Sequence, residues 1–153
     1  MSQLVTFESA SEPFAVDIFA VERVLRFEVP RRLPNSASWL RGVIDNNGRT
    51  IPVVDLRERL NLPGTEATEH SRILVIMAGD TLVGMTVDAV HAVISVPDGA
   101  IEPPPAIYRG LAREYLQGVA RHDERIFVVL DAARLLTSTE RIEMEQAMRA
   151  VQA

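Results

Sequence analysis

The 153-residue chain contains no cysteine, which excludes disulfide bonds and thiolate metal sites. Its three histidines, His70, His91 and His122, lie in separate segments without the clustering of a metal site, so we expect each to be structural or solvent-exposed. There are 21 acidic against 16 basic residues, and the resulting net charge of −5 argues against nucleic acid as a partner. The sequence therefore predicts no metal and no other cofactor.

Long apolar runs are also missing. None approaches the roughly 20 residues needed to span a bilayer, and the first residues lack the basic and apolar regions of a signal peptide. We expect a soluble, cytoplasmic protein without direct membrane insertion.

Enzyme motifs are missing as well. There is no glycine-rich phosphate loop and no G-x-S-x-G sequence. Asp55 and Asp131 resemble a catalytic carboxylate pair, but each follows a strand-like run and is expected to cap the turn behind it. The sequence gives no support for catalysis.

What the chain does have is an internal repeat. Residues 39–60 read WLRGVIDNNGRTIPVVDLRERL, and residues 115–136 read YLQGVARHDERIFVVLDAARLL, with seven identities in 22 ungapped positions. Residues 19–25 similarly match residues 88–94, sharing one alanine and two valines. One small structural unit is therefore used twice.

The repeated unit has the pattern of short strands joined by tight turns. Asn47-Gly48 between two β-branched runs is a strong hairpin signal, because both residues tolerate positive φ. Further strands are expected at residues 4–7, 14–18, 72–77 and 81–87. Short strands at regular spacing predict two small β barrels packed together.

Two other segments have a distinct character. Residues 97–114 connect the second valine segment to the second hairpin, and Pro103-Pro104-Pro105 predicts a stiff, extended connector there. Residues 139–153 are rich in Glu, Met, Ala, Gln and Arg and predict an amphipathic helix, capped by Thr137, Ser138 or Thr139.

The candidate binding residues come from the repeat. Small or β-branched residues recur in matching places, and glycine in a strand often marks the close approach of another backbone or a ligand. Packed side by side, the two barrels would line a groove with these residues, and an exposed apolar groove is a partner site. The alternative is that the valines are ordinary core residues. The groove candidates are Val21, Val24, Gly42, Gly84, Val90 and Val93.

Several of these motifs together resemble the CheW family of chemotaxis coupling proteins. They are Val21-x-x-Val24, the run G-V-I at residues 42–44, the run G-R-T-I-P-V-V-D-L-R at residues 48–57, and the run V-G-M-T-V-D-A-V at residues 83–90. The resemblance extends over residues 4–136.

This resemblance implies a mainly β fold of two intertwined five-stranded barrels similar to Src-homology-3 domains, with short helices and a C-terminal helix. Residues 1–138 would form the CheW-like domain, built from repeats at about 4–62 and 72–136 with strand exchange between them. Residues 139–153 would form the separate C-terminal helix.

The resemblance also implies function. A CheW-like protein would be a non-enzymatic adaptor that couples the cytoplasmic tips of chemoreceptors to the regulatory domain of a histidine kinase, CheA, in membrane-associated arrays. Other CheW-like domains are further expected partners. The receptor would occupy the groove between the barrels. The alternative is a regulator that binds only one partner, in an accessory pathway such as twitching or surface motility.

One turn departs from the family pattern. The usual Asn-Leu-Arg-Gly is replaced here by Asp45-Asn46-Asn47-Gly48, so Asn47 stands where the family has a partner-contacting arginine. Many members also carry a carboxylate at the position of Arg23. We therefore expect Arg23, Asp45, Asn46 and Asn47 to form a second, variant partner site.

Overall fold

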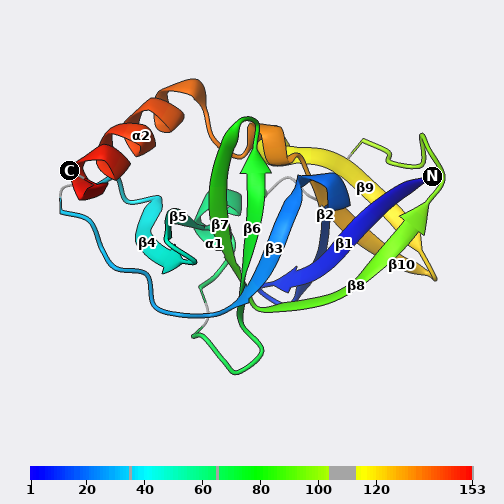
Figure 1. Ribbon diagram of the computed structural model, residues 1–153. Helices are drawn as coiled ribbons and strands as arrows, with labels where there is room; N and C mark the ends of the chain where they lie inside the picture. The colour runs from blue at the N-terminus through cyan, green and yellow to red at the C-terminus, as the bar shows by residue number, and fades with distance from the viewer. Residues whose placement is uncertain (35, 65, 104–112, 153) are drawn as a thin grey trace.

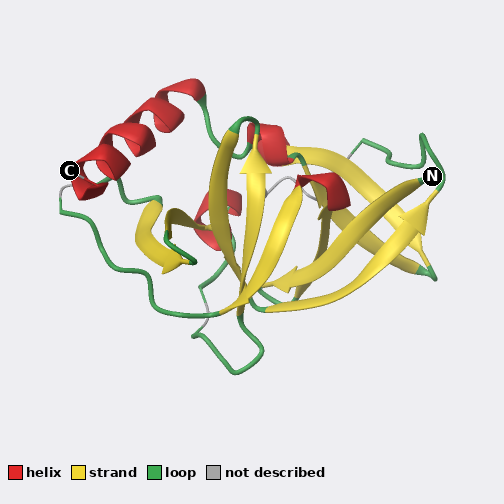
Figure 2. Cartoon of the chain, in the orientation of Figure 1, coloured by secondary structure: helices red, strands yellow, loops and turns green. Residues whose placement is uncertain are grey.

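The computed structural model describes residues 1–34, 36–64, 66–103 and 113–152. Within these residues strands dominate, and the longer of the two α-helices lies at one end of the molecule (Figures 1 and 2). The strands are β1 Ser2–Ser9, β2 Glu12–Asp17, β3 Val21–Arg26, β4 Leu40–Asn46, β5 Arg49–Asp55, β6 Arg72–Ala78, β7 Thr81–Val87, β8 Ala89–Val96, β9 Leu116–His122 and β10 Arg125–Leu130. The helices are α1 Leu56–Leu60 and α2 Ser138–Gln152, with 3-10 turns η1 Ile18–Ala20, η3 Arg113–Tyr115 and η4 Ala132–Arg134.

The strands form two five-stranded sheets that exchange hairpins. Sheet A has the order β8-β1-β2-β10-β9, and sheet B has the order β3-β6-β7-β5-β4. The N-terminal hairpin β1–β2 is thus inserted between strands of the second repeat, and β6–β7 is inserted between strands of the first. This arrangement confirms the predicted intertwined fold. The repeat boundaries at 4–62 and 72–136 describe the sequence, whereas each sheet draws on both repeats.

Alternation along the strands explains the core. In β6, Leu74 and Ile76 join a large central cluster that includes residues of both sheets, while Ile73 and Val75 face a smaller cluster inside sheet B. Successive side chains of a strand point to opposite faces, so a continuous apolar run indicates burial on both sides. Leu4 and Phe127 belong to a third cluster, inside sheet A.

The predicted Asn-Gly hairpin is confirmed. Asn46 pairs with Arg49, and the two central residues, Asn47 and Gly48, have φ of 49° and 78°. Two positive φ angles are the signature of the tight turn whose twist matches the flanking strands.

The C-terminal helix begins one residue earlier than expected, at Ser138, with Thr137 as its cap. The Thr137 hydroxyl oxygen accepts a hydrogen bond from the Glu140 amide (3.1 Å), and the Glu140 carboxylate accepts one from the Thr137 amide (2.9 Å). These reciprocal hydrogen bonds form a capping box, and they identify Thr137 as the cap among the three candidates in the sequence T-S-T-E. Within the described residues, no helix has both the length and the apolar character that crossing a membrane requires. Half of the predicted connector 97–114, namely residues 104–112 with two of its three consecutive prolines, lies outside the described residues.

Candidate partner-binding surfaces

The first V-x-x-V segment is a bulged strand. Residues three apart in a regular strand face opposite sides. Here the pairing of β3 with β6 shifts register between Val21 and Arg23, so that Val21 lies opposite Ile76 and Val24 lies opposite Leu74. Directly paired residues share a face, so both valines lie on the same side as the central core cluster.

The second V-x-x-V segment repeats this device. The pairing of β8 with β1 shifts register so that Val90 lies opposite Phe7 and Val93 lies opposite Val5. The Thr6 hydroxyl donates to the Ala92 carbonyl (2.9 Å) and accepts from the Ala92 amide (3.1 Å), which satisfies backbone groups at the bulge. Both valines of β8 therefore also share one face.

We call Val21, Val24, Val90 and Val93 the valine face. Val24 and Val93 are 43% and 52% exposed, whereas Val21 and Val90 are partly buried against the central cluster. Val24 and Val93 therefore have the exposure that a groove residue needs, whereas Val21 and Val90 are closer to the core alternative. Because β3 and β8 are each the outer strand of a sheet, both segments are reachable from outside.

The two predicted groove glycines lie elsewhere, inside the fold. A Cβ at Gly42 (φ 145°) would lie 2.3 Å from the Arg31 carbonyl oxygen, because the backbones of Arg31 and Val43 bond reciprocally (2.8 and 2.9 Å). A Cβ at Gly84 would lie 2.8 Å from a methyl carbon of Ile73. Both glycines are buried and make close approaches within the chain itself. A partner surface must therefore be argued from the valines.

The variant turn and its neighbour do lie together. The Arg23 guanidinium donates to the Asn46 side-chain oxygen (2.9 Å), and Arg49 forms an ion pair with Glu22. Asp45 accepts from the Thr50 hydroxyl (3.1 Å) and lies 3.5 Å from Arg31. Asn47 is exposed at the turn tip. The β4–β5 turn is thus connected to β3 by two contacts: the hydrogen bond from Arg23 to the neutral Asn46 side chain, and the Arg49–Glu22 ion pair.

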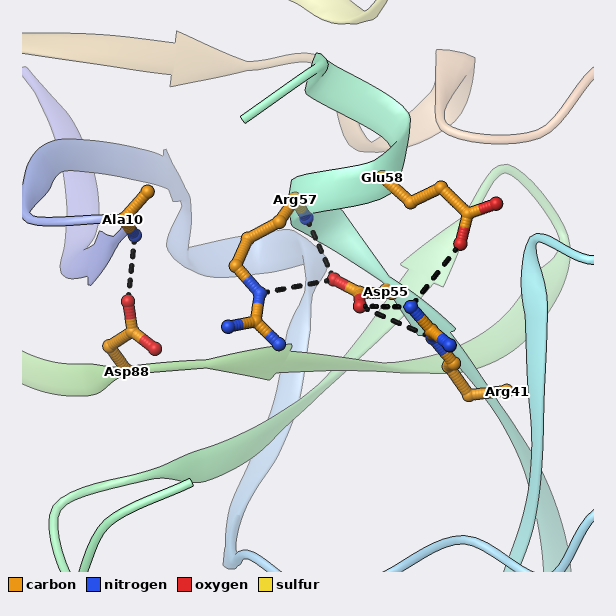
Figure 3. A network of polar contacts seen from close by, with 6 residues as sticks. All are labelled: Ala10, Arg41, Asp55, Arg57, Glu58 and Asp88. Carbon is orange, nitrogen blue, oxygen red and sulfur yellow. Dashed lines mark hydrogen bonds and ion pairs between the residues drawn. The ribbon is translucent and has the colours of Figure 1, made fainter. Parts of the chain in front are cut away.

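Asp55 and Asp131 are capping residues, as predicted. Asp55 accepts from the Arg57 amide (2.9 Å) and Asp131 from the Ala133 amide (3.1 Å). Figure 3 shows Asp55 held between Arg41 and Arg57, with Arg41 also reaching Glu58 (3.5 Å). Burial, the largest influence, would raise the pKa of Asp55, but the charge of Arg57 and the hydrogen bonds from Arg41 and Arg57 together lower it. Such a carboxylate is locked in place as a structural anion.

A second buried charge holds the C-terminal helix. The Arg59 side chain is 4% exposed, lies between the rings of Trp39 and Tyr115 (5.0 and 5.3 Å to the centroids) and pairs with Glu140 of α2. Burial acts to raise the pKa of Glu140, yet the hydrogen bonds from Arg59 and Thr137 hold it below its ordinary value. The ion pair therefore fastens α2 to α1.

The histidines lie apart. His91 is half-exposed beside Glu8, with 3.2 Å between its Nε2 and the carboxylate. Among the described residues, no group of three or more His, Asp or Glu side chains is arranged to hold a metal ion.

Comparison with known proteins identifies the family. The CheW-like domain family matches residues 3–140. The chain belongs to the CheW-like family. The chemotaxis protein CheW of Klebsiella aerogenes is 30% identical over 138 residues, which cover 90% of this chain and 83% of that protein. CheW of Bacillus subtilis is 30% identical over 134 residues, covering 88% and 86%.

Structural similarity agrees with the sequence match. The crystal structure of the scaffolding protein TtCheW from Thermoanaerobacter tengcongensis has a TM-score of 0.82 and 28% identity, covering 91% of this chain and 90% of that one. Protein FrzA of Myxococcus xanthus is also similar, at 30% identity over 118 residues, with 76% and 73% covered. The CheW-like fold described above is therefore shared along nearly the whole chain.

Two features of the site were missed from sequence. The bulges are one; their signal was present, because valines three apart in an otherwise strand-like segment are out of phase with a regular strand. The other is the exposed Phe19, 92% accessible in the turn before β3, which no pattern had marked.

Proposed function

We propose that this CheW-like domain is a non-enzymatic scaffold of chemotaxis signalling. It couples the cytoplasmic tips of chemoreceptors to the regulatory domain of a CheA-type histidine kinase. In this proposal it acts in the cytoplasm, at membrane-associated receptor arrays. Family membership over residues 3–140, together with relatives named as chemotaxis and scaffolding proteins, supports this function.

The observation that carries the proposal is the duplicated bulge. Two separate segments, β3 and β8, share a strand irregularity that turns a pair of valines to one face. Bulges of this kind recur next to functional sites because they re-aim side chains. Exposed Val24 and Val93, beside half-buried Val21 and Val90, offer an apolar surface suited to the apolar stripe of a helical hairpin.

The variant turn supplies the second contact of the proposal. Arg23, Asp45, Asn46 and Asn47 gather at one end of sheet B and would face the kinase. Arg23 donates to the neutral Asn46 side chain and lies 3.5 Å from Glu22, which also pairs with Arg49, so two arginines share one carboxylate there. We expect a kinase partner to present an acidic group at this place, since charge complementarity sets specificity and association rate.

The test is a pull-down of the purified protein on two kinds of beads. One carries the kinase regulatory domain and the other a receptor cytoplasmic fragment, both from the same cell; beads with an unrelated protein are the control. Retention on both is the expected result. Retention on one alone would replace the coupling function by a single-partner regulator in an accessory motility pathway, and retention on neither would reject both.

A further inference from the structure

Two neighbouring hollows share Phe27. They lie at the end of sheet B where β3, β5 and β7 end, opposite to the β4–β5 turn. The first has a volume of about 410 Å³, and its walls include Val29, Arg32, Arg41 and Arg57. The second, of about 420 Å³, has Arg26 and Arg72 in its walls. Because Phe27 lines both, the hollows are neighbours, and we call their combined walls the arginine surface.

The charge of this surface opposes that of the whole chain. Five arginines line the two hollows. Three carboxylates are near them, Asp55 and Glu69 in the walls and Glu58 at 3.5 Å from Arg41, whereas the whole protein carries a net charge of −5. Asp55 is already engaged by both Arg41 and Arg57. The surface therefore has a local excess of positive charge that would attract an anionic group.

Two of the arginines are placed against each other. Arg26 and Arg72 are directly opposite in the β3–β6 pair, and like charges at such positions destabilise a sheet. Arg72 donates to the backbone carbonyls of Glu69 and Ser71 (2.8 Å each), so those contacts bring no countercharge. A carboxylate bound between Arg26 and Arg72 would relieve this repulsion.

The walls between the charges are apolar. Val29 is 82% exposed and Phe27 is half-buried, with Pro30 beside them. A guanidinium binds a carboxylate through two parallel hydrogen bonds, while the half-buried ring of Phe27 and the exposed Val29 favour an apolar side chain. The arrangement thus alternates charged, apolar and charged contacts.

We propose that the arginine surface binds a short, extended, acidic segment of a partner protein, with the order acid, apolar, acid. One carboxylate pairs with Arg32 at the first hollow, since Arg41 is already engaged by Asp55 and Glu58. The apolar side chain lies on Phe27, and the second carboxylate lies between Arg26 and Arg72. A nucleic acid strand fits less well, since its continuous phosphates would meet Asp55, Glu58 and Glu69 around the same hollows.

The surface is distinct from most of the valine face. Arg26 lies two residues beyond Val24 on the same face of β3, but Arg32 and Arg41 belong to the following loop and to β4. Val93 lies in the other sheet. Binding of an acidic segment is therefore separable from binding at Val93.

The experiment titrates the protein into a fluorescein-labelled peptide with the repeated order Glu-Leu-Glu and follows fluorescence anisotropy. Peptides with Gln in place of Glu, and a labelled oligo-dT of similar length, are run in parallel. The expected result is saturable binding of the Glu peptide that weakens at least tenfold between low and physiological salt, with at least tenfold weaker binding of the Gln peptide.

Variants localise the binding. Arg32→Ala combined with Arg72→Ala is expected to weaken Glu-peptide binding at least tenfold, whereas the exposed Arg121→Ala in sheet A and Val93→Asp leave it within twofold. Circular dichroism checks that each variant folds, and Arg32→Ala alone serves if the double variant does not. Equal binding of the Glu and Gln peptides, equal loss in Arg121→Ala, or tighter binding of oligo-dT would each overturn the proposal.

Discussion

Gly42 and Gly118 occupy equivalent places in the two repeats, and each lies beneath the backbone of the connection that precedes its strand. The Arg31 backbone bonds to Val43 in one repeat, and the Glu102 backbone bonds to Val119 in the other. A Cβ would lie 2.3 Å from the Arg31 oxygen and 2.1 Å from the Glu102 oxygen. In both repeats the crossing connection covers the outer strand of a sheet, which blocks that edge from pairing with another chain.

The charged residues of the two repeats are less alike. Asp55 is buried between two arginines, while its counterpart Asp131 is more exposed and lies 3.4 Å from Arg134. The buried Arg59, paired with α2, has Leu135 as its counterpart, a residue of the apolar core. The duplicated backbone is thus maintained by glycines and bulges, whereas polar anchoring has been concentrated in the first repeat.

The largest effects should come from the shared glycines. Gly42→Ala and Gly118→Ala each place a methyl group against a backbone oxygen at φ of 145° and 156°, and each is expected to lower the free energy of unfolding by at least about 3 kcal/mol. Urea denaturation measures this. Gly64→Ala, whose added Cβ meets nothing within 4 Å, is the control and should change stability little. A loss below about 1 kcal/mol at either site would show that the crossing connection shifts to accommodate the methyl group, and would contradict the expected close approach.

The next prediction concerns Arg59, a buried charge in the first repeat whose counterpart in the second repeat is apolar. Arg59→Leu introduces the residue type found at position 135 and leaves Glu140 without its partner, so we expect a loss of about 3 kcal/mol. Adding Glu140→Gln removes the stranded charge while keeping an acceptor for the Thr137 amide, and should recover at least half of that loss. Thermal and urea unfolding check both variants. Equal stability of the single and double variants would mean that the ion pair is not what holds α2.

The pH dependence of stability tests the two carboxylates that pair with arginines, Asp55 and Glu140. The pKa values of Asp55 and Glu140 are lowered in the folded protein from ordinary values of 3.8 and 4.5. Their contribution to stability is therefore complete above the ordinary values and is lost as the pH falls below about 5 toward the lowered ones. Asp55→Asn should flatten this acid loss and cost about 2 kcal/mol at pH 7 through the weakened contacts with Arg41 and Arg57.

Asp131→Asn is the matched control for that variant. It changes a cap that has Arg134 nearby and should cost about 0.5 kcal/mol at pH 7. The free energy of unfolding of each asparagine variant is measured from pH 3 to pH 7. Identical profiles for the two asparagine variants would remove the proposed asymmetry.

The last prediction concerns the variant turn and pairs a small loss of stability with a gain in binding. Asn47→Arg introduces the arginine expected from the family resemblance and should strengthen association with a standard CheA-type kinase and receptor pair. Because residue 47 has φ of 49°, the change is expected to cost about 1 kcal/mol. Asp123→Arg occupies the same place in the second repeat, also with φ of 49°, and should carry the same cost without any gain in binding. Equal binding of the two variants would show that the first turn is not a contact.

Much of the fold could be predicted from sequence because its determinants are local. The Asn47-Gly48 turn, the T-S-T-E cap and the matched aspartate caps each report a nearby backbone geometry. The repeat itself predicted two units. Which hairpin enters which sheet depends on long-range pairing between β2 and β10 and between β5 and β7, and no local signal specifies it.

The candidate site was harder to predict. The four valines could be proposed from the repeat, but their common face depends on register shifts against β6 and β1. The glycines had been assigned to the groove because small residues suggest close approach; the approaching group is the chain's own backbone at Gly42 and a core side chain at Gly84. The Arg59–Glu140 pair joins residues 81 positions apart and left no pattern in the sequence.

The most direct test of the account is the affinity of a receptor cytoplasmic fragment for Val24→Asp and Val93→Asp, measured by isothermal titration calorimetry. Ile142→Asp, on the exposed side of α2, is the matched control. We predict folded proteins by circular dichroism, at least tenfold weaker binding for each valine variant, and unchanged binding for the control. Unfolding of either valine variant, or binding equal to that of the control, would contradict the claim that the duplicated bulges build a partner surface.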